Sequence, residues 1–126
     1  MKTFICILCL ALSGCTWMRT FDPVEYNHLN DLVTIADLNE SKCSTPESQK
    51  ELVNMLSNKM AYIMNYVKHS YANAYAYNTL IEVDKNITEL ALRVATGKAS
   101  VNYCKVKLQL ISITTGEIQY TLGNMR

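Results

Sequence analysis

Residues 46–77 read PESQKELVNMLSNKMAYIMNYVKHSYANAYAY and carry the clearest secondary-structure signal in the chain. The series Val53, Leu56, Met60, Ile63, Val67, Ser70, Ala74 and Tyr77 advances in steps of three and four residues. Such steps place side chains on one face of an α-helix, whereas a strand would alternate every second residue. Ser44 or Thr45 is suited to be the N-cap, with Pro46 in the first turn. We therefore expect one helix from Pro46 to about Tyr77.

Helices are also expected on both sides of this stretch. Upstream, Asp22 fits an N-cap, Pro23 the first helical position, and Glu25 can bond back to the cap, so a helix should run from Pro23 to about Asn39. Its apolar stripe comprises Leu29, Leu32, Val33 and Ala36. Downstream, Thr79 and Glu82 have capping-box spacing and predict an interruption or restart. The following stripe comprises Leu80, Val83, Ile87, Leu90 and Val94, with Gly97 as a natural stop.

The last segment allows two interpretations. Steps of three and four connect Val101, Cys104, Leu108, Ile111, Thr115, Ile118 and Leu122, as in a helix. Residues 105–110 also alternate polar and apolar side chains, and residues 114–117 resemble a hairpin turn. A lone hairpin needs other strands or a helix face to pack on, and the chain offers no other strand, so we favour the helix. The expected fold is all-α, a small bundle of three to four amphipathic helices, and an α+β fold with a C-terminal β-hairpin is the alternative.

The N-terminal residues indicate processing and a lipid anchor. An apolar run at residues 4–12 is too short to span a bilayer, which takes about 20 residues, and fits the core of a signal peptide. Leu12-Ser13-Gly14-Cys15 then resembles the lipobox of bacterial lipoproteins. The resemblance implies cleavage before Cys15, a diacylglyceryl group on its thiol and an acyl chain such as palmitate on the new N-terminus. An ordinary secretory signal followed by a cysteine is the alternative.

The resemblance also implies a location and a domain division. Thr16, where inner-membrane lipoproteins carry Asp, resembles an outer-membrane address, so the protein is expected to be anchored there and to face the periplasm. Residues 1–14 would be the signal peptide, residues 15–21 the lipidated N-terminus and tether, and residues 22–126 a single helical periplasmic domain. The 112 residues from Cys15 onward suffice for one domain.

Charge limits the possible partners. From residue 15 onward eleven bases balance eleven acids, so no nucleic-acid partner is expected. The charges are unevenly placed, with a net −5 in residues 22–51 and a net +4 in residues 59–126. We expect the two parts to pack on each other, and a basic face kept for a partner is the alternative.

Cysteine use predicts one disulfide. Cys6 and Cys9 leave with the signal peptide and Cys15 carries lipid, so Cys43 and Cys104 remain as a pair in the oxidising periplasm. Their bond would clamp the bundle across a separation of 61 residues, worth about 4 kcal/mol in the chain-entropy model.

Motifs for catalysis and metal binding are not found. The sequence has neither Gly-x-Ser-x-Gly nor His-Glu-x-x-His, and neither His28 nor His69 has ligand spacing with a cysteine. We therefore expect no enzyme, metal or cofactor, and a small periplasmic hydrolase is the least favoured alternative.

Two sets of residues are candidates for protein contacts. On a helical wheel Tyr62, Tyr66 and Tyr77 lie to one side of the apolar series and would form a tyrosine-rich interface. Half-buried rings between helix layers are the alternative. The second set is a basic end that comprises Lys98, Lys105 and Lys107.

A second resemblance covers most of the mature chain. Small helical lipoproteins encoded by tailed bacteriophages are similar at Phe21-Asp22…Glu25-Tyr26, Cys43 and Tyr103-Cys104…Lys107-Leu108…Ile111…Ile118-Gln119…Gly123…Arg126. It implies a non-enzymatic protein that binds an envelope protein, either as an outer-membrane spanin subunit in host-cell lysis or in superinfection exclusion. A host envelope accessory or assembly lipoprotein is the alternative, and neighbouring endolysin and holin genes would favour lysis. The oligomeric state is left open.

Overall fold

The computed structural model describes residues 23–68 and 74–123, and within these residues it contains helices and no strand. The elements in order are α2 (Pro23–Leu38), the short 3₁₀ helix η1 (Glu40–Ser44), α3 (Pro46–Lys68), α4 (Ala74–Ala95) and α5 (Val101–Gly123). The described chain is thus an all-α bundle, as expected, and the α+β alternative is wrong.

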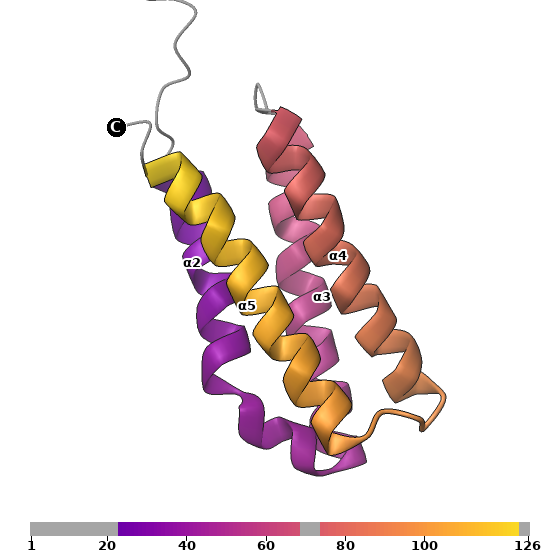
Figure 1. Ribbon diagram of the computed structural model, residues 1–126. Helices are drawn as coiled ribbons and strands as arrows, with labels where there is room; N and C mark the ends of the chain where they lie inside the picture. Colours follow the sequence, from indigo (N-terminus) through magenta and orange to yellow (C-terminus); the bar gives the residue numbers. More distant parts are fainter. Residues whose placement is uncertain (1–22, 69–73, 124–126) are drawn as a thin grey trace, which may run out of the picture.

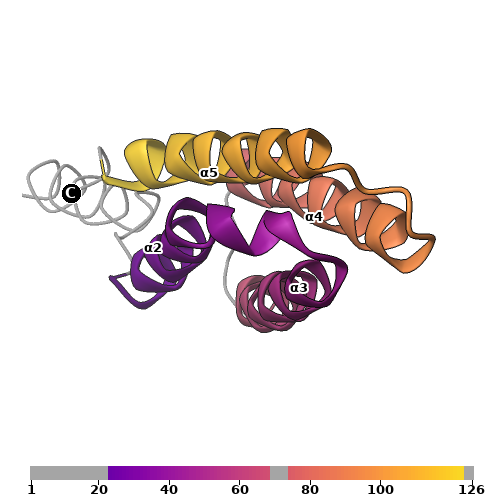
Figure 2. The same cartoon turned by 90° about the horizontal axis from the view of Figure 1, so that it is seen from below.

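The four long helices form a closed ring of antiparallel neighbours. Each helix packs on the next along the chain, and α5 returns to lie beside α2, with which it shares the most extensive contact (Figure 1). The view from below shows the α2–α3 pair on one side of the bundle and the α4–α5 pair on the other (Figure 2). The start of α2 and the end of α5 therefore lie at the same end of the bundle, and η1 lies at the opposite end.

The core is built from the apolar stripes that the sequence predicts. In α4 all five predicted residues are buried, and in α2 Val33 alone of the four is half-buried. In α3 the buried series begins earlier than expected and comprises Gln49, Leu52, Leu56, Met60, Ile63 and Val67. Val53 is only half-buried and packs against the edge of this core, because Leu52 takes the central position.

α3 is shorter than the sequence predicts. It ends at Lys68, and α4 begins at Ala74, so the expected continuous helix to Tyr77 is wrong. The Thr79 to Glu82 spacing lies inside α4 and does not mark a helix start. The physical reason is burial, because folding back lets the apolar faces of α3 and α4 cover each other, whereas one long helix would leave both exposed.

Local signals define three of the other helix ends. Thr45 is the N-cap of α3, since its Oγ1 accepts a hydrogen bond from the Ser48 N–H at 3.2 Å. After α4, Gly97 has a φ of +69°, and the Lys98 N–H donates to the Arg93 carbonyl at 2.9 Å, which completes a Schellman motif. Ser100 then caps α5 by accepting from the Tyr103 N–H at 3.0 Å.

α5 is a continuous helix through the segment that also resembles a hairpin. Six of its seven predicted stripe residues are buried, and Val101 at its first position is exposed. The Thr115 hydroxyl donates to the Ile111 carbonyl at 2.6 Å, so this buried polar group is satisfied within the helix. Burial along α5 therefore outweighs the low helix propensity of its β-branched residues and Gly116.

The signal peptide, the lipobox and the tether lie outside the described residues, as do Asp22, Cys15 and His69. Within the described ranges, no helix is both long enough and apolar enough to span a bilayer.

Candidate interaction surface

The predicted disulfide joins Cys43 in η1 to Cys104 in the second turn of α5, with 5.6 Å between the Cα atoms. That separation is usual for a disulfide, and both residues are fully buried. The bond ties the end of the bundle that carries η1 to the helix that returns beside α2. Because it is buried, its role is to hold the fold together.

Gln49 supports the same end and was not singled out by the sequence. Its buried Nε2 donates to the Cys43 carbonyl at 2.8 Å and to the Ala99 carbonyl at 3.3 Å. Gln49 thereby joins η1 to the turn between α4 and α5. The sequence did carry a signal for its burial, because Gln49 lies three residues before Leu52 and so continues the buried apolar stripe of α3.

Two of the three predicted tyrosines take part in one cluster. The ring of His28 on α2 lies 4.7 Å from the ring of Tyr62 and 5.6 Å from that of Tyr66, in both cases edge to face. Tyr66 is half-buried against the core, whereas Tyr62 is 57% exposed. Tyr77 belongs to α4, so the predicted single face of three tyrosines on one helix is wrong.

An ion pair completes this cluster. The Lys59 ammonium donates to Asp31 Oδ2 at 2.9 Å and to His28 Nδ1 at 3.2 Å, and it lies 5.5 Å from the centre of the Tyr62 ring. Because an ammonium has only donors, Nδ1 of His28 accepts. We name His28, Asp31, Lys59, Tyr62 and Tyr66 the His28 cluster. The His28 cluster could not be predicted from the sequence, because its residues come together only when α2 packs against α3.

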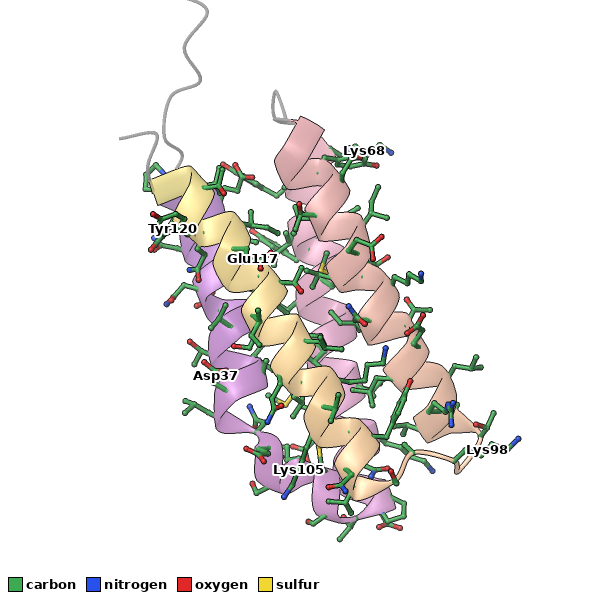
Figure 3. All side chains as sticks on the ribbon, in the orientation of Figure 1. Asp37, Lys68, Lys98, Lys105, Glu117 and Tyr120 are labelled. Carbon is green, nitrogen blue, oxygen red and sulfur yellow. A yellow bond between two sulfur atoms is a disulfide. The ribbon has the colours of Figure 1, made fainter. Side chains whose placement is uncertain are left out.

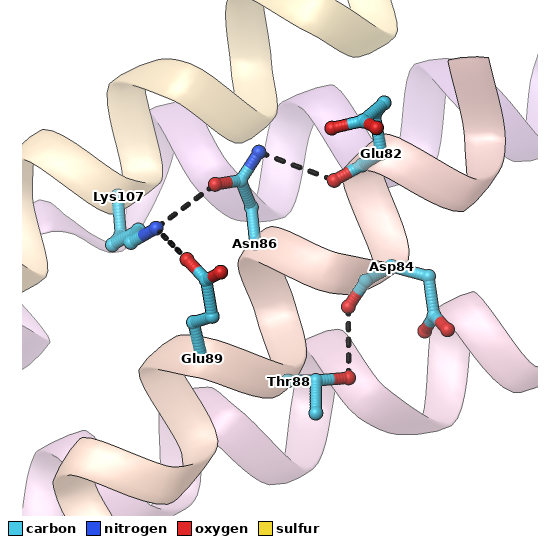
Figure 4. Close-up of polar contacts among 6 residues, drawn as sticks. All are labelled: Glu82, Asp84, Asn86, Thr88, Glu89 and Lys107. Atoms are coloured by element: carbon cyan, nitrogen blue, oxygen red, sulfur yellow. Dashed lines mark hydrogen bonds and ion pairs between the residues drawn. The ribbon is translucent and has the colours of Figure 1, made fainter.

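The predicted basic end is not a free basic face. Lys107 is only 12% exposed, and its ammonium donates to Glu89 and, at 2.9 Å, to Asn86 Oδ1 (Figure 4). The hydrogen bond from Lys107 to Glu89 and the positive charge of Lys107 hold the pKa of the Glu89 carboxyl below its usual 4.5, and Lys85 lowers it slightly further. Lys107 is therefore held by α4 and is not available to a partner.

The other two lysines are separated from Lys107. Lys105 lies 3.8 Å from a carboxylate oxygen of Glu40, and Lys98 is exposed in the turn between α4 and α5 (Figure 3). Residues two apart on a helix do not share a face, which is why Lys105 and Lys107 point to different neighbours. The ion pairs of Lys105 with Glu40 and of Lys59 with Asp31 join the basic and acidic parts of the chain, as the charge distribution predicts.

The surface feature that the sequence analysis missed lies on the outside of α5. Val106, Leu110, Ile113 and Tyr120 are all between 42% and 74% exposed. Their signal was present in the sequence as a second series with steps of four, three and seven residues, beside the buried one. It was hidden because residues 105–110 also fit strand alternation.

Other kinds of site find little support in the described part of the chain. A groove of about 290 Å³ between α3 and α4 is lined by Lys50, Val53, Asn54, Ala91, Val94 and Ala95. Its side chains include no carboxylate, histidine or thiol. The residues at 23–68 and 74–123 also contain no group of three or more His, Cys, Asp or Glu side chains placed to hold a metal ion.

Comparison of the chain with protein-family models, with curated proteins and with solved structures finds no match.

Proposed function

We propose that the protein is a non-enzymatic, outer-membrane-anchored lipoprotein that faces the periplasm and binds an envelope protein through the His28 cluster. The observation that carries the proposal is Tyr62, a residue that is 57% exposed and whose ring nevertheless packs edge to face against His28. An exposed tyrosine fixed before binding loses little conformational entropy on association and offers both an apolar face and a hydroxyl.

The surroundings of Tyr62 suit a protein contact. The His28 ring packs against both Tyr62 and Tyr66, and the Lys59–Asp31 ion pair places a paired charge beside Tyr62. Interfaces commonly combine an aromatic centre with a polar rim of this kind. The partner surface that fits is a shallow apolar depression with hydrogen-bonding groups at its edge.

The lipobox supports a location close to the membrane. If Cys15 carries the lipid, the eight residues from there to Pro23 reach at most about 28 Å. His28 lies in the second turn of α2, so the His28 cluster would face the periplasm near the outer membrane. The disulfide end of the bundle would point away from the membrane.

Photo-cross-linking in intact cells tests the partner. A photoreactive residue at Asn58, an exposed position one turn before Tyr62, should form an adduct with a specific envelope protein, and Tyr62→Ala should remove that adduct. The matched control is Leu92→Ala, which removes an apolar side chain of similar exposure on α4 and should leave the adduct unchanged.

The identity of the adduct distinguishes the proposed roles. An inner-membrane protein encoded beside this chain would support a spanin subunit, a phage receptor would support superinfection exclusion, and a host assembly component would support the accessory role. An adduct that persists after Tyr62→Ala would contradict the assignment to the His28 cluster.

A further inference from the structure

The hydrogen bond from Lys59 occupies the nitrogen of His28 that would take up a proton. The Lys59 ammonium donates to Nδ1 at 3.2 Å, and an ammonium has only donors, so Nδ1 carries no proton in this arrangement. A neutral imidazole then has its one proton on the other nitrogen, Nε2. The second proton of an imidazolium must therefore bind at Nδ1. Protonation of His28 and the hydrogen bond from Lys59 thus exclude each other.

The groups around His28 come from α2 and α3. On α2, the buried carboxyl of Glu25 lies one turn before His28, and the exposed carboxyl of Asp31 lies one turn after it. The groups that face the ring from α3 are the Lys59 ammonium and the phenols of Tyr62 and Tyr66. Lys59 is thus the cation against which a charged His28 would be placed.

The other elements that pack on α2 direct their polar groups elsewhere along it. α5 reaches α2 through Gln119, which donates to Asn30 at 3.5 Å, and through Ser112, which donates to Asp37 at 2.5 Å. The charged residues of η1 form ion pairs with α3 and α5. The response to a proton on His28 therefore falls on Lys59 and on the carboxylate that holds it.

A proton on Nδ1 forces Lys59 away from His28. Two like charges at the distance of this hydrogen bond repel each other, and the repulsion is stronger where water is partly excluded. The Lys59 side chain is only 20% exposed, whereas Asp31 is 59% exposed and offers Lys59 an outward position at the end of their ion pair. Lys59 then also leaves its place beside the Tyr62 ring. The net charge of His28, Asp31 and Lys59 changes from zero to +1.

We propose that the His28 cluster is a pH-sensitive binding surface, which holds its partner while His28 is neutral and releases it when His28 takes up a proton. This inference rests on the proposed function, because it concerns the same surface. A partner fitted to the neutral set of charges would meet an additional cation and a displaced Lys59. Histidine side chains ordinarily change charge between about pH 5 and 8. Because porins are water-filled channels through the outer membrane, an acidic medium would supply the signal.

Nuclear magnetic resonance of the purified full-length protein in detergent tests the switch without a partner. At about pH 8 the ring nitrogen shifts should show a proton on Nε2 alone, with a nuclear Overhauser effect between Lys59 and the His28 ring. At about pH 5 both nitrogens should carry protons, and this effect should be lost. His69→Gln removes the other histidine of the chain, so the remaining imidazole signal belongs to His28. A proton on Nδ1 at about pH 8, or a Lys59 contact that survives protonation, would overturn the proposal.

Photo-cross-linking from Asn58 at the same two pH values tests the effect on the partner. The adduct should form at about pH 8 and be several-fold weaker at about pH 5, both in the parent and in His69→Gln. His28→Asn keeps an acceptor oxygen near the position of Nδ1 and does not titrate. Its yield should be lower than that of the parent and equal at both pH values. Both values lie above the usual 4.5 of Glu89, so the acid sensitivity of the fold does not contribute.

The outcomes separate this inference from the proposed function. Equal adduct yields at both pH values in the parent would overturn the pH-sensitive release and leave the proposed function standing. A pH dependence that persists in His28→Asn would place the titrating group elsewhere and overturn the role of His28. No adduct at either pH would contradict the proposed function, and the regulation of that surface with it.

Discussion

Two glycines show how differently the same residue contributes to this fold. Gly97 adopts a φ of +69°, which is strained for any residue with a Cβ, and it closes the Schellman motif after α4. Gly116 lies within α5, and a Cβ added there would meet no heavy atom within 4 Å outside its own helical turn. Gly97 is therefore required by the backbone, whereas Gly116 is not required by packing within the described chain.

Replacing each glycine with alanine should change stability in opposite directions. Gly116→Ala is expected to raise the free energy of unfolding by about 1 kcal/mol, because glycine is the poorer helix former. Gly97→Ala should lower it by about 1–2 kcal/mol, because alanine is strained in the left-handed region. Urea denaturation of the dilute protein measures both changes, and equal signs for the two variants would contradict this account.

Glu89 gives the fold a pH dependence. Lys107 keeps the pKa of the Glu89 carboxyl below its usual 4.5 in the folded state. A carboxyl whose pKa is lower in the folded protein than in the unfolded protein stabilises the fold at pH values above its unfolded-state pKa. This contribution is lost as the pH falls through its folded-state pKa. Stability should thus decrease on acidification below about pH 4.5, and less steeply in Glu89→Gln.

Unfolding by urea at a series of acidic pH values measures the effect. The matched control is Glu47→Gln, an exposed carboxyl in the first turn of α3, far along the chain from Lys107. If Glu89→Gln and the parent protein lose stability in parallel as the pH falls, Lys107 does not act through the charge of Glu89.

At the scale of elements, the sequence predicted which segments are helical but not where α3 ends. The stripe of α5 indicated a helix although residues 105–110 also suit a strand, and its burial against α2 and α4 bears this out. Residues 69–73 contain neither Gly nor Pro, and Asn73, a residue type that favours the N-cap, was the one local signal before α4. The end of α3 depends on the packing of α3 against α4, which the apolar pattern within one segment does not predict.

The disulfide is the covalent link between elements, and its removal should be costly. Cys43→Ala with Cys104→Ala opens a closure of 61 residues and should lower the free energy of unfolding by about 4 kcal/mol in the chain-entropy model. Helix content should persist at low temperature, because the apolar stripes remain.

Thermal unfolding followed by circular dichroism measures the change in melting temperature. The parent protein under reducing conditions is the control, and it should approach the melting temperature of the double variant. An unchanged melting temperature in both cases would show that the bond closes a loop already restricted in the unfolded chain.

At the scale of the molecule, the sequence placed the candidate site only in part. It selected Tyr62 and Tyr66, but His28, Asp31 and Lys59 join them only once α2 lies against α3. It also grouped Lys105 with Lys107, which the bundle directs to Glu40 and Glu89 on different elements. Contacts between helices thus decide which side chains remain free to bind a partner. The spacing of residues within one helix does not predict these contacts.

The direction in which the bundle is presented depends on Cys15. Because the start of α2 and the end of α5 share one end of the bundle, a lipid on Cys15 would leave the η1 end, with its disulfide, farthest from the membrane. A single acyl chain binds a membrane only reversibly, so the two or three chains implied by the lipobox are what would make the anchor lasting.

Cys15→Ser should therefore abolish labelling by a lipid precursor and leave the protein as an uncleaved precursor or in the soluble fraction. Cys9→Ser is the matched control, since it changes a cysteine in the apolar run and keeps Leu12-Ser13-Gly14-Cys15 intact, and it should be labelled normally. Metabolic labelling with a fatty acid, followed by membrane fractionation, measures both. If Cys15→Ser still carried label and sedimented with outer membranes, the anchor would lie elsewhere, and the proposed orientation of the bundle would be wrong with it.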